Sequence, residues 1–270
     1  MPRIHPTAIV DGGARLAEDV EVGPYCLVEP DVELGPGTVL RSHAIVRRYT
    51  TMGGGNFVDS FAVLGGEPQD LKFRPETVSY LRIGHRNVFR EHVTIHRGSV
   101  EGGATTVGSG TFWMATSHAG HDVTVEDEAI LVNGAKMGGH TRLGRAAILA
   151  GNVGIHQFCW VGERVMAQGN SAITMHIPPY VLMAERTEVV ALNRVGLRRA
   201  PELSDEDRRQ IKEAFRLTYR SGLTPAGALA EMDARDGWGA AAGRFRQFVR
   251  DVLEAQPPYN RGLAGPRRRR

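Results

Sequence analysis

The sequence has few cysteines, few aromatic residues and no long apolar run. Of its 270 residues, 2 are cysteine and 7% are aromatic, which excludes a disulfide scaffold and argues against a zinc site built on thiolates. No apolar run approaches the ~20 residues of a membrane-spanning helix, so a transmembrane protein is excluded as well. The N-terminus reaches Pro6 and Asp11 before a signal-peptide core of ~7–15 apolar residues can form, which predicts a cytoplasmic protein.

Positive charge is in slight excess, and the excess is local. The formal net charge is +3 at pH 7, and residues 267–270 are all arginine. Without this tail the chain is close to neutral, so no surface for nucleic acid is expected. The tail could contact an acidic partner, but a solvated chain end explains it equally simply.

Glycine is what the sequence has in excess. It contains 33 glycines, about 12% where ~7% is usual, and their even spread suggests an internal repeat. Read from His5 in blocks of six, ten successive blocks end on an apolar residue, and nearly all have a small residue two places earlier. The ten end residues are Val10, Leu16, Val22, Val28, Leu34, Leu40, Val46, Met52, Val58 and Leu64. The same spacing, with interruptions, continues to Ile173.

A period of six predicts the fold of most of the chain. It matches neither the helical period of 3.6 nor the strand period of two, but it fits short strands joined by corners. Three hexads form one triangular coil, and coils stack at ~4.8 Å with the apolar position inside and Gly, Asp or Asn at the turns. We therefore expect an all-β parallel β-helix over residues 1–177, with a loop insertion at 65–80 and a second glycine-rich stretch at 97–106.

The hexad rhythm stops at Pro178, and a small helical domain is predicted over residues 178–264. Ser204 and Thr224 have the character of N-caps, the latter with proline at the first helical position. An amphipathic third helix is expected from about 239 to 255. These helices would cover the C-terminal end of the repeat, and residues 265–270 form a basic tail.

Four of the ten histidines lie within 39 residues of the repeat. They are His118, His121, His140 and His156. His121, Gly139 and Gln157 are 18 residues apart, as are Asp122 and His140, so each set is expected to stack on one edge in adjacent coils. A row of imidazoles is a candidate acid–base site because histidine titrates near neutral pH, and Asp122 could orient a ring. The alternative is that the histidines only form part of a polar wall.

Several segments resemble a known family in order and spacing. They are GGEPQDLKF (65–73), VTIHRGS (93–99), HAGHD (118–122), GGH (138–140), IHQFCWVG (155–162), IPPYV (177–181), GLRR (196–199) and RGL (261–263). The chain resembles the acyl-carrier-protein:UDP-N-acetylglucosamine O-acyltransferases that begin lipid A synthesis. The resemblance implies a left-handed β-helix and a cytoplasmic homotrimer with active sites in clefts between subunits.

The resemblance also implies a reaction and the residues that perform it. A 3-hydroxyacyl chain moves from the phosphopantetheine thioester of acyl carrier protein to the 3-hydroxyl of UDP-N-acetylglucosamine, with no bound cofactor and no metal. His121 matches the general base, Asp122 its orienting partner, and the backbone N–H of Gly139 the oxyanion donor. Positions that match substrate-binding residues are Asp70, Lys72, His118, His140, His156, Gln157 and Arg199. Gly169 matches the acyl-chain ruler, and its missing side chain predicts a long acyl group, on the order of fourteen carbons.

Three alternatives remain open. Val195 stands where the family commonly has an acidic residue and Ala200 where it commonly has arginine, so the acceptor could be the 3-amino analogue of the sugar, which would be N-acylated. A carbonic-anhydrase-like β-helix enzyme would hold zinc by three histidines at a subunit interface, although no pair of histidines here has that spacing. A non-enzymatic protein would use the helical region and the tail as an interaction module on an inert solenoid.

Overall fold

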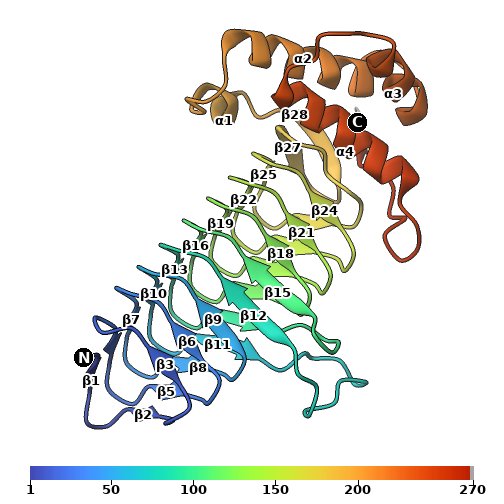
Figure 1. The fold of residues 1–270 in the computed structure, drawn as a ribbon. Helices are drawn as coiled ribbons and strands as arrows, with labels where there is room; N and C mark the ends of the chain where they lie inside the picture. Colours follow the sequence, from blue (N-terminus) through green and yellow to red (C-terminus); the bar gives the residue numbers. More distant parts are fainter. Residues whose placement is uncertain (268–270) are drawn as a thin grey trace.

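The computed structural model describes residues 1–267, so Arg268 to Arg270 of the predicted basic tail lie outside the described residues. The chain forms a three-sided prism of short strands with a helical region at its C-terminal end (Figure 1). The faces of the prism are three sheets of 12, 9 and 8 strands, which we call sheets A, B and C. Among residues 1–267, no helix combines the length and apolar character that crossing a membrane requires.

The strands of each sheet follow one another along the prism. Sheet A contains β1 (Arg3–Ile4), β4 (Glu21–Val22), β7 (Val39–Leu40), β10 (Phe57–Val58), β13 (Val88–Phe89), β16 (Phe112–Trp113), β19 (Ile130–Leu131), β22 (Ile148–Leu149), β25 (Met166–Ala167), β27 (Val181–Ala184), β28 (Glu188–Leu192) and β29 (Gly265–Pro266). Sheet B contains β2 (Ile9–Val10), β5 (Leu27–Val28), β8 (Ile45–Val46), β11 (Val63–Gly66), β14 (Thr94–His96), β17 (His118–Ala119), β20 (Lys136–Met137), β23 (Gly154–Ile155) and β26 (Ala172–Ile173). Sheet C contains β3 (Arg15–Leu16), β6 (Glu33–Leu34), β9 (Thr50–Met52), β12 (Tyr80–Ile83), β15 (Ala104–Val107), β18 (Thr124–Val125), β21 (Arg142–Leu143) and β24 (Trp160–Val161).

Strand pairing follows the predicted period. Glu21 pairs in parallel with Val39, which pairs with Phe57, so neighbouring strands are one coil apart. Successive side chains of a strand point to opposite sides, and the last residue of each hexad is the inward one, as the buried Leu40 and Val58 illustrate. The predicted parallel β-helix of hexad repeats is confirmed.

The corners use different residues from those expected. Many left-handed corner positions carry bulky side chains instead of Gly, Asp or Asn, including Tyr25 (φ 57°), Phe61 (φ 64°) and Phe158 (φ 65°). Many glycines serve another purpose, because the backbone of the next coil lies too close for a side chain. A Cβ on Gly144 would lie 2.5 Å from the nitrogen of Glu163. Close packing of coils therefore explains more of the glycine excess than turn conformation does.

Two insertions interrupt the regular coils. The first, residues 67–79, connects β11 to β12 and stands away from the prism (Figure 1). The second, residues 97–103, connects β14 to β15. Because of them, Phe57 pairs with Val88 and Val88 pairs with Phe112, both more than 18 positions on. Both insertions leave the prism at the corner between sheets B and C.

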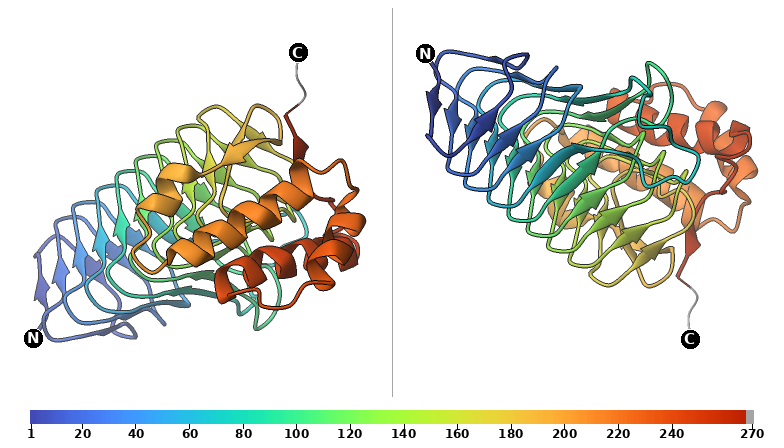
Figure 2. Two further views of the ribbon diagram at one scale, coloured as in Figure 1. Left: turned by 90° about the horizontal axis from the view of Figure 1, so that it is seen from above. Right: turned by 90° about the horizontal axis from the view of Figure 1, so that it is seen from below.

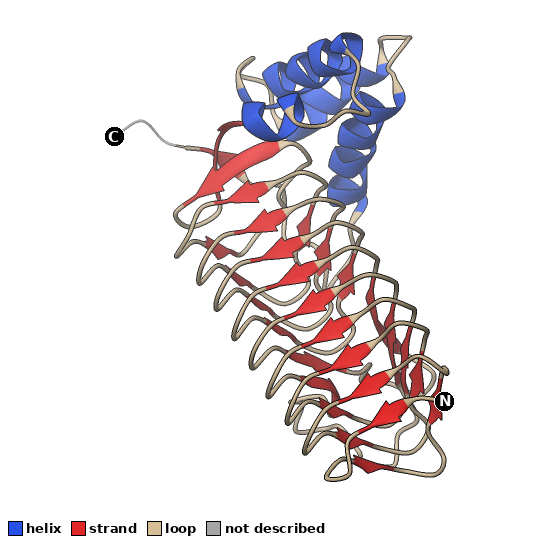
Figure 3. Ribbon diagram, turned by 90° about the vertical axis from the view of Figure 1, so that its left-hand side faces the viewer, coloured by secondary structure: helices blue, strands red, loops and turns tan. Residues whose placement is uncertain are grey.

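The region after Pro178 is less helical than predicted. β27 pairs in parallel with β25 and antiparallel with β28, so sheet A continues past the expected boundary. The helices are α1 (Arg194–Arg198), α2 (Asp205–Tyr219), α3 (Pro225–Asp233) and α4 (Ala240–Glu254). Ser204 and Thr224 cap α2 and α3 as predicted, and Ser204 forms a reciprocal capping box with Asp207. Seen from other directions, the helices lie over the C-terminal end of the prism (Figures 2 and 3).

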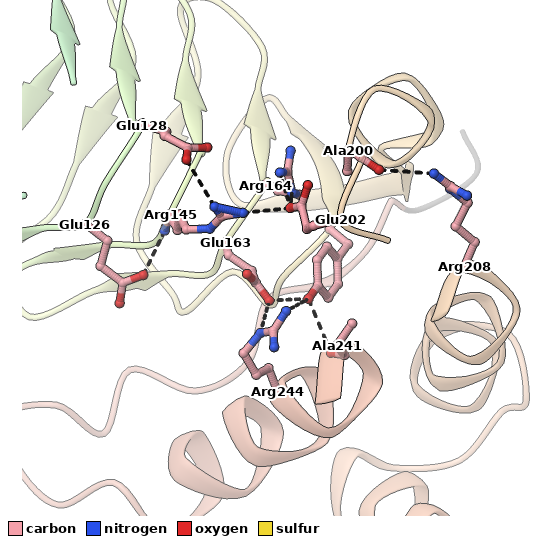
Figure 4. Close-up of polar contacts among 11 residues, drawn as sticks. Glu126, Glu128, Arg145, Glu163, Arg164, Ala200, Glu202, Arg208, Ala241 and Arg244 are labelled. Atoms are coloured by element: carbon pink, nitrogen blue, oxygen red, sulfur yellow. Dashed lines mark hydrogen bonds and ion pairs between the residues drawn. The ribbon is translucent and has the colours of Figure 1, made fainter. Parts of the chain in front are cut away.

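Ion pairs join the prism to the helical region (Figure 4). Arg145 donates to Glu202 at 2.7 Å, and Arg164 pairs with the same carboxylate. Glu163 accepts hydrogen bonds from Tyr180 and from Arg244 of α4. After α4 the chain returns to the prism, where β29 pairs with β28. The first residues of the predicted tail, Gly265 and Pro266, therefore belong to sheet A.

Candidate active site

The predicted histidine row lies at the corner between sheets B and C, just after β17 and β20. The Nδ1 atom of His121 lies 2.7 Å from Oδ2 of Asp122, and the Nε2 atom of His140 lies 3.6 Å from the same oxygen. The rings of His121 and His140 meet edge to face with centroids 5.0 Å apart. The regular stacking of coils has thus brought together the three groups that the 18-residue spacing predicted.

Asp122 is held by the second insertion as well as by His121. Its carboxylate accepts hydrogen bonds from the Ser99 N–H at 3.1 Å and from the Ser99 hydroxyl at 2.6 Å. Burial opposes ionisation of this carboxyl, but the hydrogen bonds from His121 and Ser99 outweigh it and hold its pKa below the usual value. Asp122 is therefore a carboxylate near neutral pH and favours a proton on Nδ1 of His121.

Two further imidazoles lie beside this group. Nδ1 of His118 hydrogen-bonds to the Thr94 hydroxyl at 2.8 Å, and the ring of His118 contacts that of His96 edge to face at 4.9 Å. Burial lowers the pKa of His118, and burial followed by the charges of His118 and His121 lowers the pKa of His96 to about 4. Burial also lowers the pKa of His140. His96, His118 and His140 are therefore neutral hydrogen-bonding groups near pH 7.

Gly139 lies directly against the ring of His121. A Cβ built on Gly139 would be 2.8 Å from both Cε1 and Nε2 of that ring. Within residues 1–267, the Gly139 N–H donates no hydrogen bond to another group of the chain. A free imidazole nitrogen and a free backbone N–H therefore lie side by side, which is an arrangement suited to a base and an oxyanion donor.

The remaining predicted residues border the site to different degrees. His156 and Gln157 are exposed one coil beyond Gly139. Asp70 and Lys72 are exposed on the first insertion, where the Lys72 N–H donates to the Asp70 carboxylate at 2.9 Å. The charge of Asp70 acts on His140 and favours its protonated form, which places this carboxylate electrostatically within reach of the histidines.

Two predicted residues lie away from the histidines of the same chain. Arg199, at the end of α1, lines a groove of about 980 Å³ between sheet A and helices α1 and α2. None of the four histidines of the row lines this groove. Gly169 lies at the corner between sheets A and B, between β25 and β26. A site that uses Arg199 together with His121 therefore requires two copies of the chain.

Sequence reasoning missed several groups at this corner. Ser99 and His96 lie within the motif VTIHRGS, but the insertion after it breaks the 18-residue spacing that would have connected Ser99 to Asp122. Phe158 was also missed, although it lies 18 residues after His140 and the two rings stack at 4.9 Å. Extending the 18-residue arithmetic by one coil would have found it.

One set of groups could accept a metal ion. Ligand atoms of His121, Asp122 and His140 lie within 4.8 Å of one another. The carboxylate of Asp122 already accepts hydrogen bonds from His121 and Ser99, so metal coordination would compete with contacts that the protein makes itself. The hydrogen bonds alone account for the arrangement of these three groups.

Comparison with known proteins identifies the family. The family model described as Udp N-acetylglucosamine O-acyltransferase, Domain 2, matches residues 177–263. An acyl-[acyl-carrier-protein]–UDP-N-acetylglucosamine O-acyltransferase of Burkholderia lata is 42% identical, with 97% of this chain and 99% of the relative covered. One of Syntrophobacter fumaroxidans is 41% identical over 82% of this chain and 86% of the relative. The crystal structure of UDP-N-acetylglucosamine O-acyltransferase from Moraxella catarrhalis is similar, with a TM-score of 0.89 and 35% identity over 97% of this chain and 99% of that one. The chain therefore belongs to the family of acyl-[acyl-carrier-protein]–UDP-N-acetylglucosamine O-acyltransferases.

Proposed function

We propose that this protein transfers a 3-hydroxyacyl chain from acyl carrier protein to the 3-hydroxyl of UDP-N-acetylglucosamine, the first step of lipid A synthesis. The observation that carries this proposal is the pairing of His121, whose Nδ1 faces Asp122, with the free N–H of Gly139 beneath the same ring. Identity above 40% to relatives named for this activity supports it. The donor is the phosphopantetheine thioester of acyl carrier protein, and no cofactor resident in the enzyme is required.

The chemistry follows from the two nitrogens of His121. Asp122 favours a proton on Nδ1, which leaves Nε2 free to accept the proton of the sugar hydroxyl as its oxygen attacks the thioester carbon. Negative charge then develops on the thioester oxygen, where the Gly139 N–H stabilises it. When the tetrahedral intermediate collapses, the carbon–sulfur bond breaks, and His121 returns the proton to the leaving thiolate.

The surrounding groups would bind the acceptor. His140, His118, His156 and Gln157 lie on the same corner or beside it and offer neutral hydrogen-bonding groups to sugar hydroxyls. Asp70 and Lys72 approach from the first insertion. Arg199 has the planar, permanently charged group that suits a diphosphate, and we assign it to the site of a neighbouring subunit.

The outer faces of the prism support an assembly of subunits, which we propose is a homotrimer. The outward residues of sheet A are apolar and only half-buried in the single chain. They are Val39, Phe57, Val88, Phe112, Ile130, Ile148 and Met166. The outward residues of sheet C are mostly charged or hydroxyl-bearing. They are Glu33, Thr51, Arg82, Thr106, Thr124 and Arg142. A continuous apolar row is typical of an interface, so sheet A would pack on a neighbour and bring Arg199 towards that neighbour's histidines.

The acyl chain would lie along sheet B. Small residues, Gly154 and Ala172, face outward on this sheet beyond Lys136. They separate the histidine corner from Gly169, which lies at the opposite edge of sheet B and about three coil spacings along the prism, roughly 14 Å. A shallow floor of this kind suits an extended hydrocarbon chain that ends near Gly169.

A direct acyl-transfer assay tests the function. UDP-N-acetylglucosamine is incubated with a series of 3-hydroxyacyl carrier proteins of increasing chain length, and the 3-amino analogue of the sugar is offered in parallel. We expect transfer to the 3-hydroxyl of the natural sugar, with the highest rate for a long acyl chain. Transfer only to the 3-amino analogue would contradict O-acylation and favour the N-acylating alternative.

A further inference from the structure

Phe158 continues the active-site corner by one coil. Its ring stacks on that of His140, with centroids 4.9 Å apart and an angle of 12° between the planes. Both residues have a left-handed backbone, with φ of 65° and 59°. The N–H of Phe158 donates to the carbonyl of Gly139 at 3.2 Å, and the N–H of His140 donates to the carbonyl of His121 at 3.0 Å. The backbone of each corner is thus tied to the preceding coil, and the stack follows from it.

The chain that returns after α4 covers Phe158. The ring of Tyr259 meets Phe158 edge to face with centroids 5.4 Å apart, and the guanidinium of Arg261 lies 6.0 Å from its centroid. Phe158 is therefore enclosed by His140, Tyr259 and Arg261.

A buried histidine anchors this returning segment. Nδ1 of His176 accepts a hydrogen bond from the Trp160 N–H at 3.0 Å. Its proton is consequently on Nε2, which donates to the carbonyl of Tyr259 at 2.6 Å. His176 is fully buried, so the position of Tyr259 is set by the core of the last coils and not by solvent-exposed contacts.

We propose that Phe158 is a positioning residue for His140, and that Tyr259 and Arg261 of the C-terminal segment hold Phe158 in place. This inference rests on the proposed function, in which His140 contacts the acceptor sugar. His140 meets His121 on one side and stacks on Phe158 on the other, so both the tilt and the height of its ring are constrained. Preorganisation of this kind lowers the cost of orienting the sugar.

Substitution of Phe158 provides the main test, and the chain supplies a matched control. Phe61 has φ 64° and stacks on His43 at 4.9 Å and on His92 at 5.1 Å, but it lies at the corner between sheets A and B. We expect Phe158→Leu to raise KM for UDP-N-acetylglucosamine about 10-fold with little change in kcat. Phe158→Tyr should restore the KM, and Phe61→Leu should leave it unchanged.

A second variant tests the role of the returning segment. Tyr259→Leu removes the edge-to-face contact from Phe158 without touching the sugar site, and we expect an increase in KM of about threefold. Calorimetric binding of UDP-N-acetylglucosamine to each variant gives a readout independent of turnover and should show the same ranking. Thermal unfolding of each variant separates an effect on folding from an effect on the site.

The outcomes distinguish this inference from the proposed function. If the wild-type protein transfers acyl groups but folded Phe158→Leu binds and uses the sugar as tightly as wild type, the positioning role is overturned. Equal losses in Phe158→Leu and Phe158→Tyr also overturn it, because the tyrosine ring preserves the stack. If the wild-type protein neither binds nor acylates the sugar nucleotide, the proposed function fails and this inference fails with it.

Discussion

Rings stack along two corners of the prism on the same left-handed backbone. At the corner between sheets A and B, four residues form a continuous stack with centroids 4.9 to 5.1 Å apart. They are Tyr25, His43, Phe61 and His92. At the corner between sheets B and C, His140 and Phe158 stack at 4.9 Å. In geometry alone the two corners are hard to tell apart.

The surroundings of the two stacks differ. The first is open to solvent, with Tyr25 60% and Phe61 48% exposed. The second is enclosed by both insertions and by the returning C-terminal segment, and it includes the carboxylate of Asp122. The comparison teaches that a row of histidines becomes a candidate site only where a carboxylate, a free backbone N–H and partial burial accompany it.

Removing the imidazole at each corner should break the comparison most clearly. His121→Ala removes the base, and acyl transfer should fall about 10²–10⁴-fold. His43→Ala, made as the matched change at the other corner, should leave the rate within about twofold of wild type. The acyl-transfer assay with purified protein measures both, and undiminished transfer by His121→Ala would refute the assigned base.

Adding a single methyl group at the B/C corner should have the next largest effect. The Cβ of Gly139→Ala would lie 2.8 Å from Nε2 of His121, so the ring must move away from the hydroxyl that it deprotonates. We expect kcat to fall about 10²-fold, because both the base and the oxyanion donor are displaced. Gly12→Ala, whose Cβ meets nothing within 4 Å, serves as the control. A fully active Gly139→Ala would mean that the two groups do not act at one point.

Filling the A/B corner near its C-terminal end should change selectivity and not rate. At Gly169 a Cβ would approach the carbonyl oxygen of Gly151 at 3.3 Å, which is tight but open to a small shift. A longer side chain in Gly169→Met would extend over the floor formed by sheet B. We expect the preferred acyl chain to shorten by several carbons, as measured by competition between donors. Equal relative rates with long and short donors would contradict the ruler role.

The smallest effect concerns stability in acid. Burial lowers the pKa of His96 from 6.5 to about 4, so the unfolded chain takes up a proton that the folded chain resists. Stability is therefore complete above pH 6.5 and falls as the pH drops from 6.5 towards 4. His96→Gln should reduce the loss of stability between pH 6.5 and 5 by up to about 2 kcal/mol. Denaturant unfolding at both pH values measures this, and an unchanged loss would show that other groups dominate.

The sequence by itself determined the β-helix, its inward positions and the caps of α2 and α3. It also placed His121, Asp122, Gly139 and His140 together, because regular stacking converts a separation of 18 residues into direct contact between coils. A periodic fold transmits sequence spacing into three dimensions without further information. For this part of the molecule, counting residues is close to measuring distances.

Tertiary structure decided the contacts that have no period. Ser99 meets Asp122 across an insertion of irregular length, and Tyr259 reaches Phe158 only because His176 captures the returning chain. The hairpin of β27 and β28 extends sheet A beyond Pro178, where local residue preferences gave no sign of it. Such contacts depend on which surfaces remain unburied once the coils have stacked, and that balance of packing is a property of the whole fold and not of any local stretch of sequence.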